Sequence, residues 1–272
     1  MSRLDETSHE EERQMALTQL KEYPEDRIAV ITLNNPSRRN ALSRELLQNL
    51  EENLQSLHDS PAINVVIIRA EGPVFSAGHD LREILGQDPE SVRQLFQECA
   101  RTMSLIRQVP QIVIAEVSGI ATAAGCQLVA ACDLAVAAQS AQFATPGVKI
   151  GYFCASPSVQ LARNIPRKQA AEMLFTGNFI SAADALSYGL VNRVVPDEAL
   201  REESWRFAQE IARWSLPVLR GGKEFLHHQL EMSEEGAAQF AVEFMTRQSS
   251  TVDAIQGITA FLEKRSPRWS DR

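Results

Sequence analysis

The sequence predicts an α/β protein with a largely parallel β-sheet, helices outside the sheet, and a helical region at the C-terminal end. Short β-branched runs alternate with longer amphipathic segments up to about Pro196. The run at 65–68 is apolar on both faces, as expected for a strand covered by helices on both sides. Beyond Asp197 only helical patterns remain. Alternation followed by helices alone predicts a covered parallel sheet and then a helical unit.

Composition argues against several classes of partner, although a local basic patch remains open. The 272-residue chain carries a net charge of −8, which disfavours nucleic acid and anionic membranes. Its four cysteines form no C-x-x-C pair and have no zinc-type spacing to histidine, so we expect free thiols and no metal site. Residues 1–12 are acidic and polar and show neither a secretion signal nor a mitochondrial presequence. We therefore expect a cytoplasmic protein, with residues 1–22 as a flexible acidic arm.

The elements before the centre of the chain follow from periodicity and caps. Ser43 is a plausible N-cap, because a leucine stripe with helical spacing runs from Leu46 to Leu57 behind it. Pro110 closes a later helix. The expected elements are strands at 27–33, 65–68 and 112–115, and helices from Ser43 to Leu57 and over 91–109.

The elements after the centre are bounded by glycines and capping residues. Gly177 and Gly189 are expected helix ends, because glycine adopts the left-handed conformation there. Expected N-caps are Ser181, Asp197, Ser233 and Asp253. The expected elements are a strand at 134–138, a turn at 143–147, a loop at 151–157 before a helix near Val159, helices at 166–175 and 182–188, a strand at 190–195, and helices at 197–214, 218–230, 234–249 and 253–264.

The stretch from Ser118 to Asp133 is the strongest functional signal. It follows an apolar run and opens with small residues and two glycines, Gly119 and Gly125. Free N–H groups at such a helix start favour negative charge. If that charge develops during a reaction, each donor is typically worth ~3–4 kcal/mol. The alternative is a close helix–sheet crossing that merely requires small residues. A second turn of this kind spans Phe75 to Leu81.

A chain with two such turns resembles members of the crotonase (enoyl-CoA hydratase/isomerase) superfamily. The resemblance implies a ClpP/crotonase-like spiral of ββα units over residues 23–196 and a helical oligomerisation region over 197–272. It also implies an acyl-CoA thioester substrate, no cofactor, and a homotrimer or a dimer of trimers. One subgroup of this superfamily is resembled more closely than the others. The stretches that indicate it are residues 78–81, 121–130 and 143–148. The matching stretches are Asn34–Leu42, Gly72–Leu81, Gly119–Asp133, Phe143–Pro146, Leu174–Gly177, Ala182–Val191 and Phe261–Arg265.

The resemblance also implies site residues. The amides of His79 and Ala124 are expected to hold the thioester oxygen as an oxyanion hole. The backbone around Ala41 and Ala77 is expected near the adenine, and lysine or arginine side chains near the phosphates. For each cation the alternative is a solvated surface charge. The expected substrate-binding residues are Arg38, Arg39, Ala41, Ala77, Asp80, Leu81, Phe261 and Lys264.

The sequence departs from the family at its catalytic acids. Hydratases of this family use two glutamates, and the matching positions here are Gln127 and Gly147. Each acid or base role is typically worth ~10²–10⁴-fold, so standard hydration and isomerisation are disfavoured. We expect Gln127→Glu with Gly147→Glu to create or raise hydration. Cys154 is a candidate replacement group, although a buried thiol is the commoner outcome. The His79 imidazole is expected to point away, and Gln127 to orient water or substrate.

Two functions remain open. One is an acyl-CoA enzyme that stabilises an enolate without the glutamate pair, suited to decarboxylation of a malonyl-type thioester, thioester hydrolysis or slow hydration. The other is a non-catalytic acyl-CoA-binding or assembly protein of the same fold. An RNA-binding offshoot is disfavoured by the acidic charge.

Overall fold

A computed structural model describes residues 16–270 and contains two β-sheets. The larger sheet has the strand order β1-β2-β3-β5-β7-β10. From β2 to β10 its neighbours run parallel, whereas β1 is antiparallel to β2. This confirms the predicted, largely parallel sheet. Its strands are β1 Thr18–Tyr23, β2 Ile28–Leu33, β3 Val65–Ala70, β5 Ile112–Val117, β7 Leu134–Ala138 and β10 Arg193–Val195.

The smaller sheet was not predicted. Its strand order is β4-β6-β8-β9, and only β8 and β9 are antiparallel. The turn expected at 143–147 is instead the end of β8 followed by a 3-10 helix, η3. These strands have three residues or fewer, which is too short for an alternating pattern to show. The strands are β4 Val74–Ser76, β6 Ile120–Thr122, β8 Gln142–Ala144 and β9 Ile180–Ser181.

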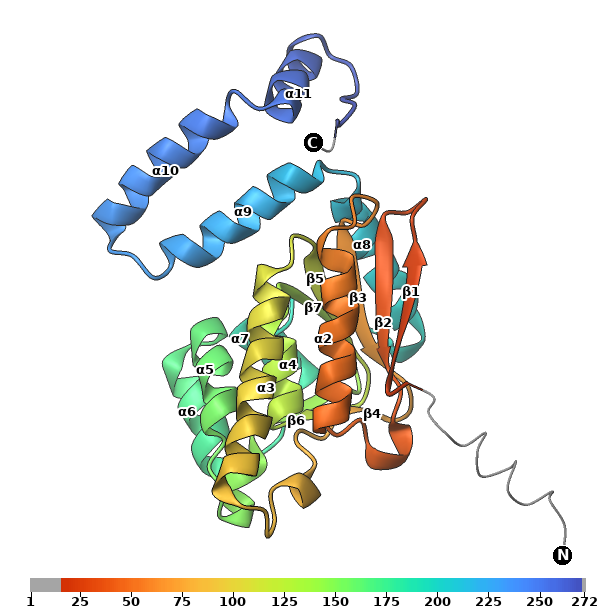
Figure 1. The fold of residues 1–272 in the computed structure, drawn as a ribbon, viewed down its shortest axis with the longest axis vertical. Coiled ribbons are helices and arrows are strands. Elements are labelled where there is room, and N and C mark those ends of the chain that lie inside the picture. Colours follow the sequence, from red (N-terminus) through yellow and green to blue (C-terminus); the bar gives the residue numbers. More distant parts are fainter. Residues whose placement is uncertain (1–15, 271–272) are drawn as a thin grey trace, which may run out of the picture.

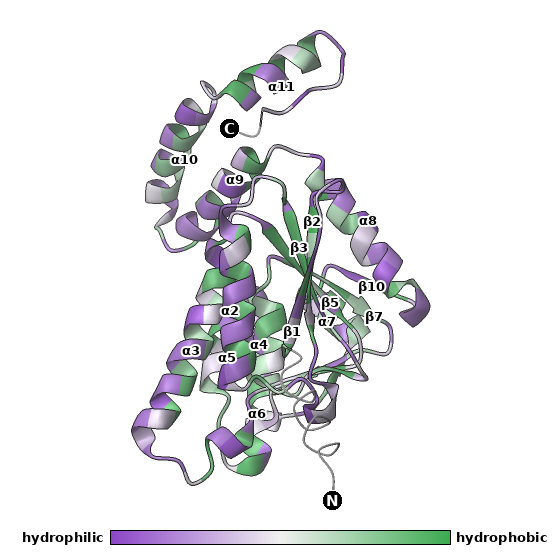
Figure 2. Cartoon of the chain, turned by 45° about the vertical axis from the view of Figure 1, so that its right-hand side comes forward, coloured by the Kyte–Doolittle hydropathy of each residue, from purple (hydrophilic) through white to green (hydrophobic). Residues whose placement is uncertain are grey.

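Helices cover both faces of the larger sheet. Figure 2 shows that sheet between α2, α3 and α4 on one side and α8 on the other. The α-helices are α2 Arg44–His58, α3 Pro89–Gln108, α4 Ala124–Ala131, α5 Ala155–Asn164, α6 Arg167–Thr176, α7 Ala182–Tyr188, α8 Leu200–Ala212, α9 Leu216–Gln229, α10 Glu234–Gln248 and α11 Val252–Leu262, and the 3-10 helices are η1 Pro36–Arg38, η2 Leu81–Glu83, η3 Pro146–Ile150 and η4 Asp197–Ala199.

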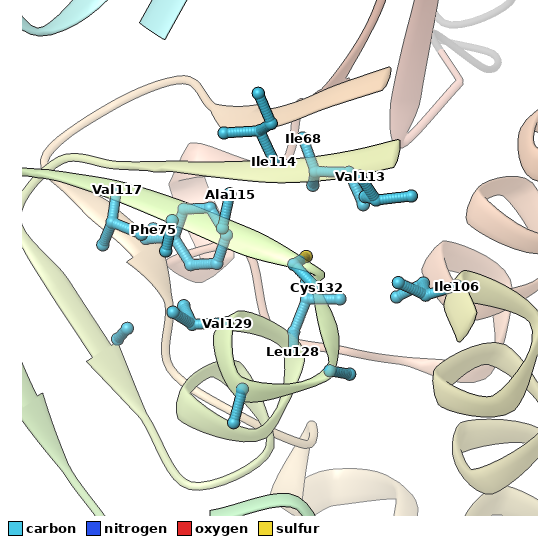
Figure 3. Packing of buried hydrophobic residues seen from close by; sticks show 14 of the residues in the cluster. Ile68, Phe75, Ile106, Val113, Ile114, Ala115, Val117, Leu128, Val129 and Cys132 are labelled. Atoms are coloured by element: carbon cyan, nitrogen blue, oxygen red, sulfur yellow. The ribbon is translucent and has the colours of Figure 1, made fainter. Parts of the chain in front are cut away.

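The core lies between the larger sheet and these helices. All six residues of β2 are buried, as expected of a strand covered on both faces. The leucine stripe of α2 is buried as predicted, and the Ser43 hydroxyl accepts the Leu46 N–H. Figure 3 shows apolar side chains of α4 facing those of β5, with Phe75 packed beside them. This packing places the second half of α4 against β5.

The predicted caps are mostly confirmed. Gly177 and Gly189 adopt the left-handed conformation that ends α6 and α7. Ser181 and Ser233 accept N–H groups at the starts of α7 and α10. Two predictions were wrong, because the side chains have partners elsewhere in the fold. The Asp197 carboxylate accepts the Ser140 N–H and caps no helix, and α11 is capped by Thr251, not by Asp253.

The predicted N-terminal arm, residues 1–22, was extended too far along the chain. Thr18–Tyr23, assigned to the arm as far as residue 22, forms β1 and pairs with β2 along its whole length. Its polar, half-exposed composition resembles a loose segment because β1 lies at the edge of the sheet. Residues 1–15 lie outside the described part of the chain.

Helices α9, α10 and α11 form a C-terminal arm that extends beyond one end of the larger sheet (Figures 1 and 2). The last described residues fold back on it: the Trp269 indole donates to the Arg213 carbonyl at 2.8 Å. Asp253 is buried and accepts the Ser215 hydroxyl at 2.6 Å and the Ser270 N–H at 2.7 Å. Helix α8, by contrast, packs on the sheet through Leu200, Ala208 and Ala212 and belongs to the core.

Candidate active site

A cavity of about 680 Å³ lies where the two small-residue turns meet. Four segments far apart in the sequence form it, together with one side chain from α3. Most of its wall is apolar, as in small-molecule sites generally. Its lining residues are Arg38, Ala41, Ala77, His79, Asp80, Leu81, Arg82, Ile84, Phe96, Ala123, Ala124, Pro146, Gly147, Lys149, Ile150, Tyr152, Phe153, Cys154, Ala155, Ser156 and Pro157.

The two turns touch through their backbones. Gly78 has φ +89°, and a Cβ there would lie 2.8 Å from the Ala123 Cβ and 3.1 Å from the Ala124 nitrogen. Only glycine therefore allows the turn that precedes His79 to approach the start of α4 so closely. His79 and Ala124 both line the cavity.

The Ala124 amide lies ahead of the helical hydrogen-bond ladder. Ala124 is the first residue of α4, and the first helical bond runs from the Gln127 N–H to the Ala123 carbonyl at 3.0 Å. An N–H at this position has no intrahelical partner. Ala123 before it has φ +50° and ψ −119°, a conformation that costs a non-glycine residue about 1–3 kcal/mol. Strain is therefore stored directly before Ala124, a residue that lines the cavity.

Asn40 holds the loop between β2 and α2 against residues 71–76, which lead into the turn before His79. Its side-chain amide donates to the carbonyls of Glu71 and Val74 at 2.9 and 2.8 Å, and its side-chain oxygen accepts the Asn35 N–H at 2.8 Å. The Ser76 hydroxyl donates to the Asn40 carbonyl at 2.8 Å. Asn40 also has φ +48°, which asparagine tolerates better than most residues. These bonds explain why position 40, within the Asn34–Leu42 stretch, is an asparagine.

The His79 imidazole lies in the wall of the cavity. Its ring makes an edge-to-face contact with Phe96, with centroids 5.1 Å apart, and Phe96 stacks on Tyr152. Within the described chain neither ring nitrogen has a hydrogen-bond partner, and Nε2 is shielded from solvent. Burial lowers the pKa of His79 to about 4, so the ring is neutral near pH 7. The expectation that this side chain points away from the site was wrong, because Phe96 of α3 holds the ring in place.

Gln127 lies behind the cavity wall. It is buried on α4, does not line the cavity, and donates from Nε2 to the Gln160 Oε1 at 3.0 Å. Its own Oε1 has no partner within residues 16–270. Gln160, on α5, therefore holds the side chain at the first glutamate position.

The second glutamate position is filled by backbone. A Cβ on Gly147 would lie 1.9 Å from the Tyr152 carbonyl oxygen and 2.8 Å from the Cys154 Sγ. The Tyr152 N–H also donates to the Gly147 carbonyl at 2.9 Å. A glutamate at 147 thus requires the Tyr152–Cys154 segment to move. A gain of hydration activity is therefore no longer expected of the Gln127→Glu, Gly147→Glu variant.

Cys154 lines the cavity as a buried thiol. Its Sγ accepts the Gly147 N–H at 3.3 Å. Burial raises the pKa of Cys154, and the Gly147 hydrogen bond offsets this only in part. The thiolate needed for nucleophilic or base chemistry is therefore disfavoured near neutral pH.

Cationic side chains surround the mouth of the cavity. Asp80 accepts two hydrogen bonds from the Arg82 guanidinium, both at 2.8 Å, and one from the Arg82 N–H at 3.1 Å, and it pairs with Arg38 at 3.4 Å. The hydrogen bonds from Arg82 lower the pKa of Asp80. Lys149 donates to the Asn178 side chain at 3.1 Å. Sequence reasoning missed Arg82, Lys149 and Phe96; the position of Arg82 in an Asp80-x-Arg turn was the only available signal.

Three predicted substrate-binding residues do not line this cavity: Arg39, Phe261 and Lys264. Arg39 has φ +53° and follows η1. Phe261 is 82% exposed on α11, which Figure 1 places at the opposite end of the molecule from β4 and β6. The other five, Arg38, Ala41, Ala77, Asp80 and Leu81, do line it. Among residues 16–270 there is no cluster of three potential metal-ligating side chains, and no helix long and apolar enough to span a bilayer.

Comparison with known proteins identifies the family of this chain. Residues 24–272 match the family model described as enoyl-CoA hydratase/isomerase. The chain is 48% identical over 247 residues to enoyl-CoA hydratase domain-containing protein 3, mitochondrial, of Rattus norvegicus, which covers 90% of this chain and 82% of that protein. This is the subgroup to which the sequence motifs pointed.

Solved structures extend the similarity to the fold. The crystal structure of the human enoyl-CoA hydratase domain-containing protein 3 superposes with a TM-score of 0.91 at 47% identity, covering 93% of this chain and all of that one. An enoyl-CoA hydratase structure from Mycobacterium smegmatis gives 0.90 at 42% identity, covering 93% and 98%. The chain therefore belongs to the enoyl-CoA hydratase/isomerase, or crotonase, family.

Proposed function

We propose that the cavity binds an acyl-CoA thioester and that the amides of His79 and Ala124 donate to its carbonyl oxygen. The contact of Gly78 with Ala123 and Ala124 supports this most directly, because it brings the backbones of both turns to one cavity. Backbone donors fixed before the reaction stabilise the charge that an enolate places on oxygen. Their action does not depend on the side chain at either residue.

The reaction proposed is one that forms the enolate without a carboxylate base. Decarboxylation of a malonyl-type thioester is of this kind. Cleavage of the bond between the α-carbon and the carboxylate releases CO₂ and leaves the electron pair of that bond on the enolate; water then supplies the α-proton and leaves as hydroxide. Hydration needs paired acid and base groups, and here position 147 has no side chain while Gln127 lies behind the wall.

A non-catalytic acyl-CoA-binding or assembly protein is the second candidate. The filled position beside Gly147 favours it, because that backbone arrangement leaves no space for the second acid. The cavity itself and its cationic mouth are retained in this alternative.

The two candidates differ in turnover, not in binding. Purified protein would be tested for binding and turnover with crotonyl-, 3-enoyl-, malonyl-, methylmalonyl- and long-chain acyl-CoA. The enzyme proposal expects turnover of a malonyl-type ester, and a bound-state structure with the thioester oxygen within hydrogen-bond distance of both amides. Tight binding without turnover of any ester would favour the second candidate, and no binding of any ester would overturn both.

Arg38 provides a test of CoA phosphate binding. Its side chain is 55% exposed at the cavity mouth. Loss of a charge-assisted hydrogen bond costs about 1.5 kcal/mol, so Arg38→Ala should weaken CoA binding about tenfold, and less at high salt. Arg206→Ala is a matched control, because Arg206 is 59% exposed in an ion pair on α8. Equal affinities of the two variants, measured by calorimetry, would contradict the assignment.

We also propose that the chain forms a homotrimer or a dimer of trimers. The C-terminal arm exposes Leu226, Leu230, Val242, Met245, Ile255, Ile258 and Phe261, an apolar set unusual on a monomer surface. Phe261 and Lys264 do not line the cavity of their own chain. Contact with a neighbouring chain would give these two residues a role in the assembly. Light scattering should give a mass of three or six 30.2 kDa chains; a monomer would contradict the proposal.

The cytoplasmic location stays a prediction, and the rat relative is named mitochondrial.

A further inference from the structure

We infer that the His79 imidazole selects acyl groups that carry a hydrogen-bonding oxygen, such as a hydroxyl, keto or carboxyl oxygen, over plain alkyl chains. This inference rests on the proposed acyl-CoA function and deepens it, because it assigns a substrate class to the same cavity. It concerns the side chain of a residue whose backbone amide has a separate proposed role.

The His79 ring is a polar group in an apolar part of the cavity. It packs edge-on against Phe96, and Phe96 stacks on Tyr152. Ile84, Phe153 and Pro157 line the same cavity. The polar side chains at the mouth, Asp80, Arg82 and Lys149, are hydrogen-bonded to other groups, whereas the imidazole has no partner within residues 16–270.

An unpaired buried polar group normally has a missing partner. More than nine in ten buried polar groups are hydrogen-bonded, and an unpaired one is destabilising. Two other side chains near the start of α4, Gln127 and Thr145, likewise keep a buried oxygen without a partner. The imidazole is different, because His79 lines the cavity and those two residues do not. Nε2 of His79 is shielded from the cavity as well as from solvent, but Nδ1 is not shielded and has no hydrogen-bond partner within residues 16–270. A ligand in the cavity can therefore meet the His79 ring at Nδ1.

A neutral imidazole suits this class of ligand. It has one N–H donor and one acceptor nitrogen, so it pairs with a hydroxyl in either direction and donates to a keto or carboxylate oxygen. A plain alkyl chain displaces water from the cavity and leaves the ring unpaired. A site built around a hydrogen-bonding group rejects ligands that lack its partner.

The experiment compares acyl-CoAs of equal chain length by calorimetry: butyryl-CoA, 3-hydroxybutyryl-CoA, acetoacetyl-CoA and succinyl-CoA. At least one oxygenated ester should bind the wild-type protein about tenfold more tightly than butyryl-CoA, as expected for one hydrogen bond in place of an unpaired group. His79→Leu should abolish that ratio. His79→Gln, which keeps a donor and an acceptor, should restore part of it.

Phe153→Leu is the control for cavity shape, because Phe153 lines the cavity and its ring packs against Phe175 and not against His79. It changes the same wall without altering a polar group, so it should shift all four affinities together and keep their ratios. A change in the His79 ring nitrogen resonances on binding the preferred ester provides a readout that shape alone would not give. Equal affinities for all four esters, or a ratio that survives His79→Leu, would overturn the inference while leaving acyl-CoA binding intact. No binding of any ester would overturn the proposed function itself.

Discussion

Lys223→Met is expected to lower the free energy of unfolding by about 3–5 kcal/mol, the cost of breaking a buried ion pair from one side. The Lys223 ammonium is buried on α9, 2.6 Å from the Asp133 carboxylate, and donates to the carbonyls of Ile106 and Gln111 at 2.8 and 2.9 Å. Its loss removes the donor to both carbonyls and leaves the carboxylate with the Val113 N–H at 2.8 Å and His227 at 3.4 Å as its remaining partners. Burial lowers the pKa of Lys223, and the neighbouring Asp133 opposes that shift.

The same variant should also loosen the C-terminal arm. Asp133 lies at the end of α4 and accepts the Val113 N–H at 2.8 Å, so the Lys223 pair joins the arm to the centre of the sheet. Urea titration measures the stability, and hydrogen exchange in α9 measures the loosening. Adding Asp133→Asn to Lys223→Met should recover part of the loss, because it removes the unpaired charge. Arg220→Ala, which breaks an exposed pair on the same helix, should change stability by less than about 1 kcal/mol. Equal effects of Lys223→Met and Arg220→Ala would contradict the assignment.

Gly147→Ala is expected to cost about 3 kcal/mol, because its Cβ would meet the Tyr152 carbonyl at 1.9 Å. The neighbour is backbone, so no rotamer change relieves the contact. Either stability falls by this amount in urea, or the Tyr152–Cys154 segment moves and the Cys154 thiol loses its bond from the Gly147 N–H. Cys154 should then react faster with a thiol reagent.

Gly222→Ala is the matched control. Gly222 lies inside α9, where a Cβ would meet nothing within 4 Å. Alanine should therefore stabilise the helix by roughly 0.5–1 kcal/mol. If Gly147→Ala matches the wild type in stability and in thiol reactivity, the close packing around residue 147 is wrong.

The elements that the sequence predicted are those fixed by local pattern. β2, β3, β5 and β7 each contain a run of at least four apolar residues, and α2 combines a leucine stripe with the Ser43 cap. Strand β1 was missed because an edge strand is half polar. Asp253 was taken for a cap because its partners, Ser215 and Ser270, lie at distant positions in the chain.

The candidate site was predictable as far as backbone geometry determines it. The glycines around His79 and Ala124 mark turns that must approach closely, and both residues do line one cavity. What surrounds these turns depends on tertiary contacts. The position of the His79 ring is set by Phe96 on α3, and the space beside Gly147 is set by Tyr152 five residues later. No periodicity or motif encodes either contact.

The folded-back C-terminal end determines what tryptophan emission can report. Trp214 and Trp269 have ring centroids 6.5 Å apart at the base of the C-terminal arm, and the third tryptophan, Trp205, contacts Tyr23 at the sheet edge. None of the three lines the cavity of the candidate site. Intrinsic fluorescence should thus follow undocking of the arm and respond little to ligand entry. An optical binding assay for this protein therefore needs a chromophore on the ligand.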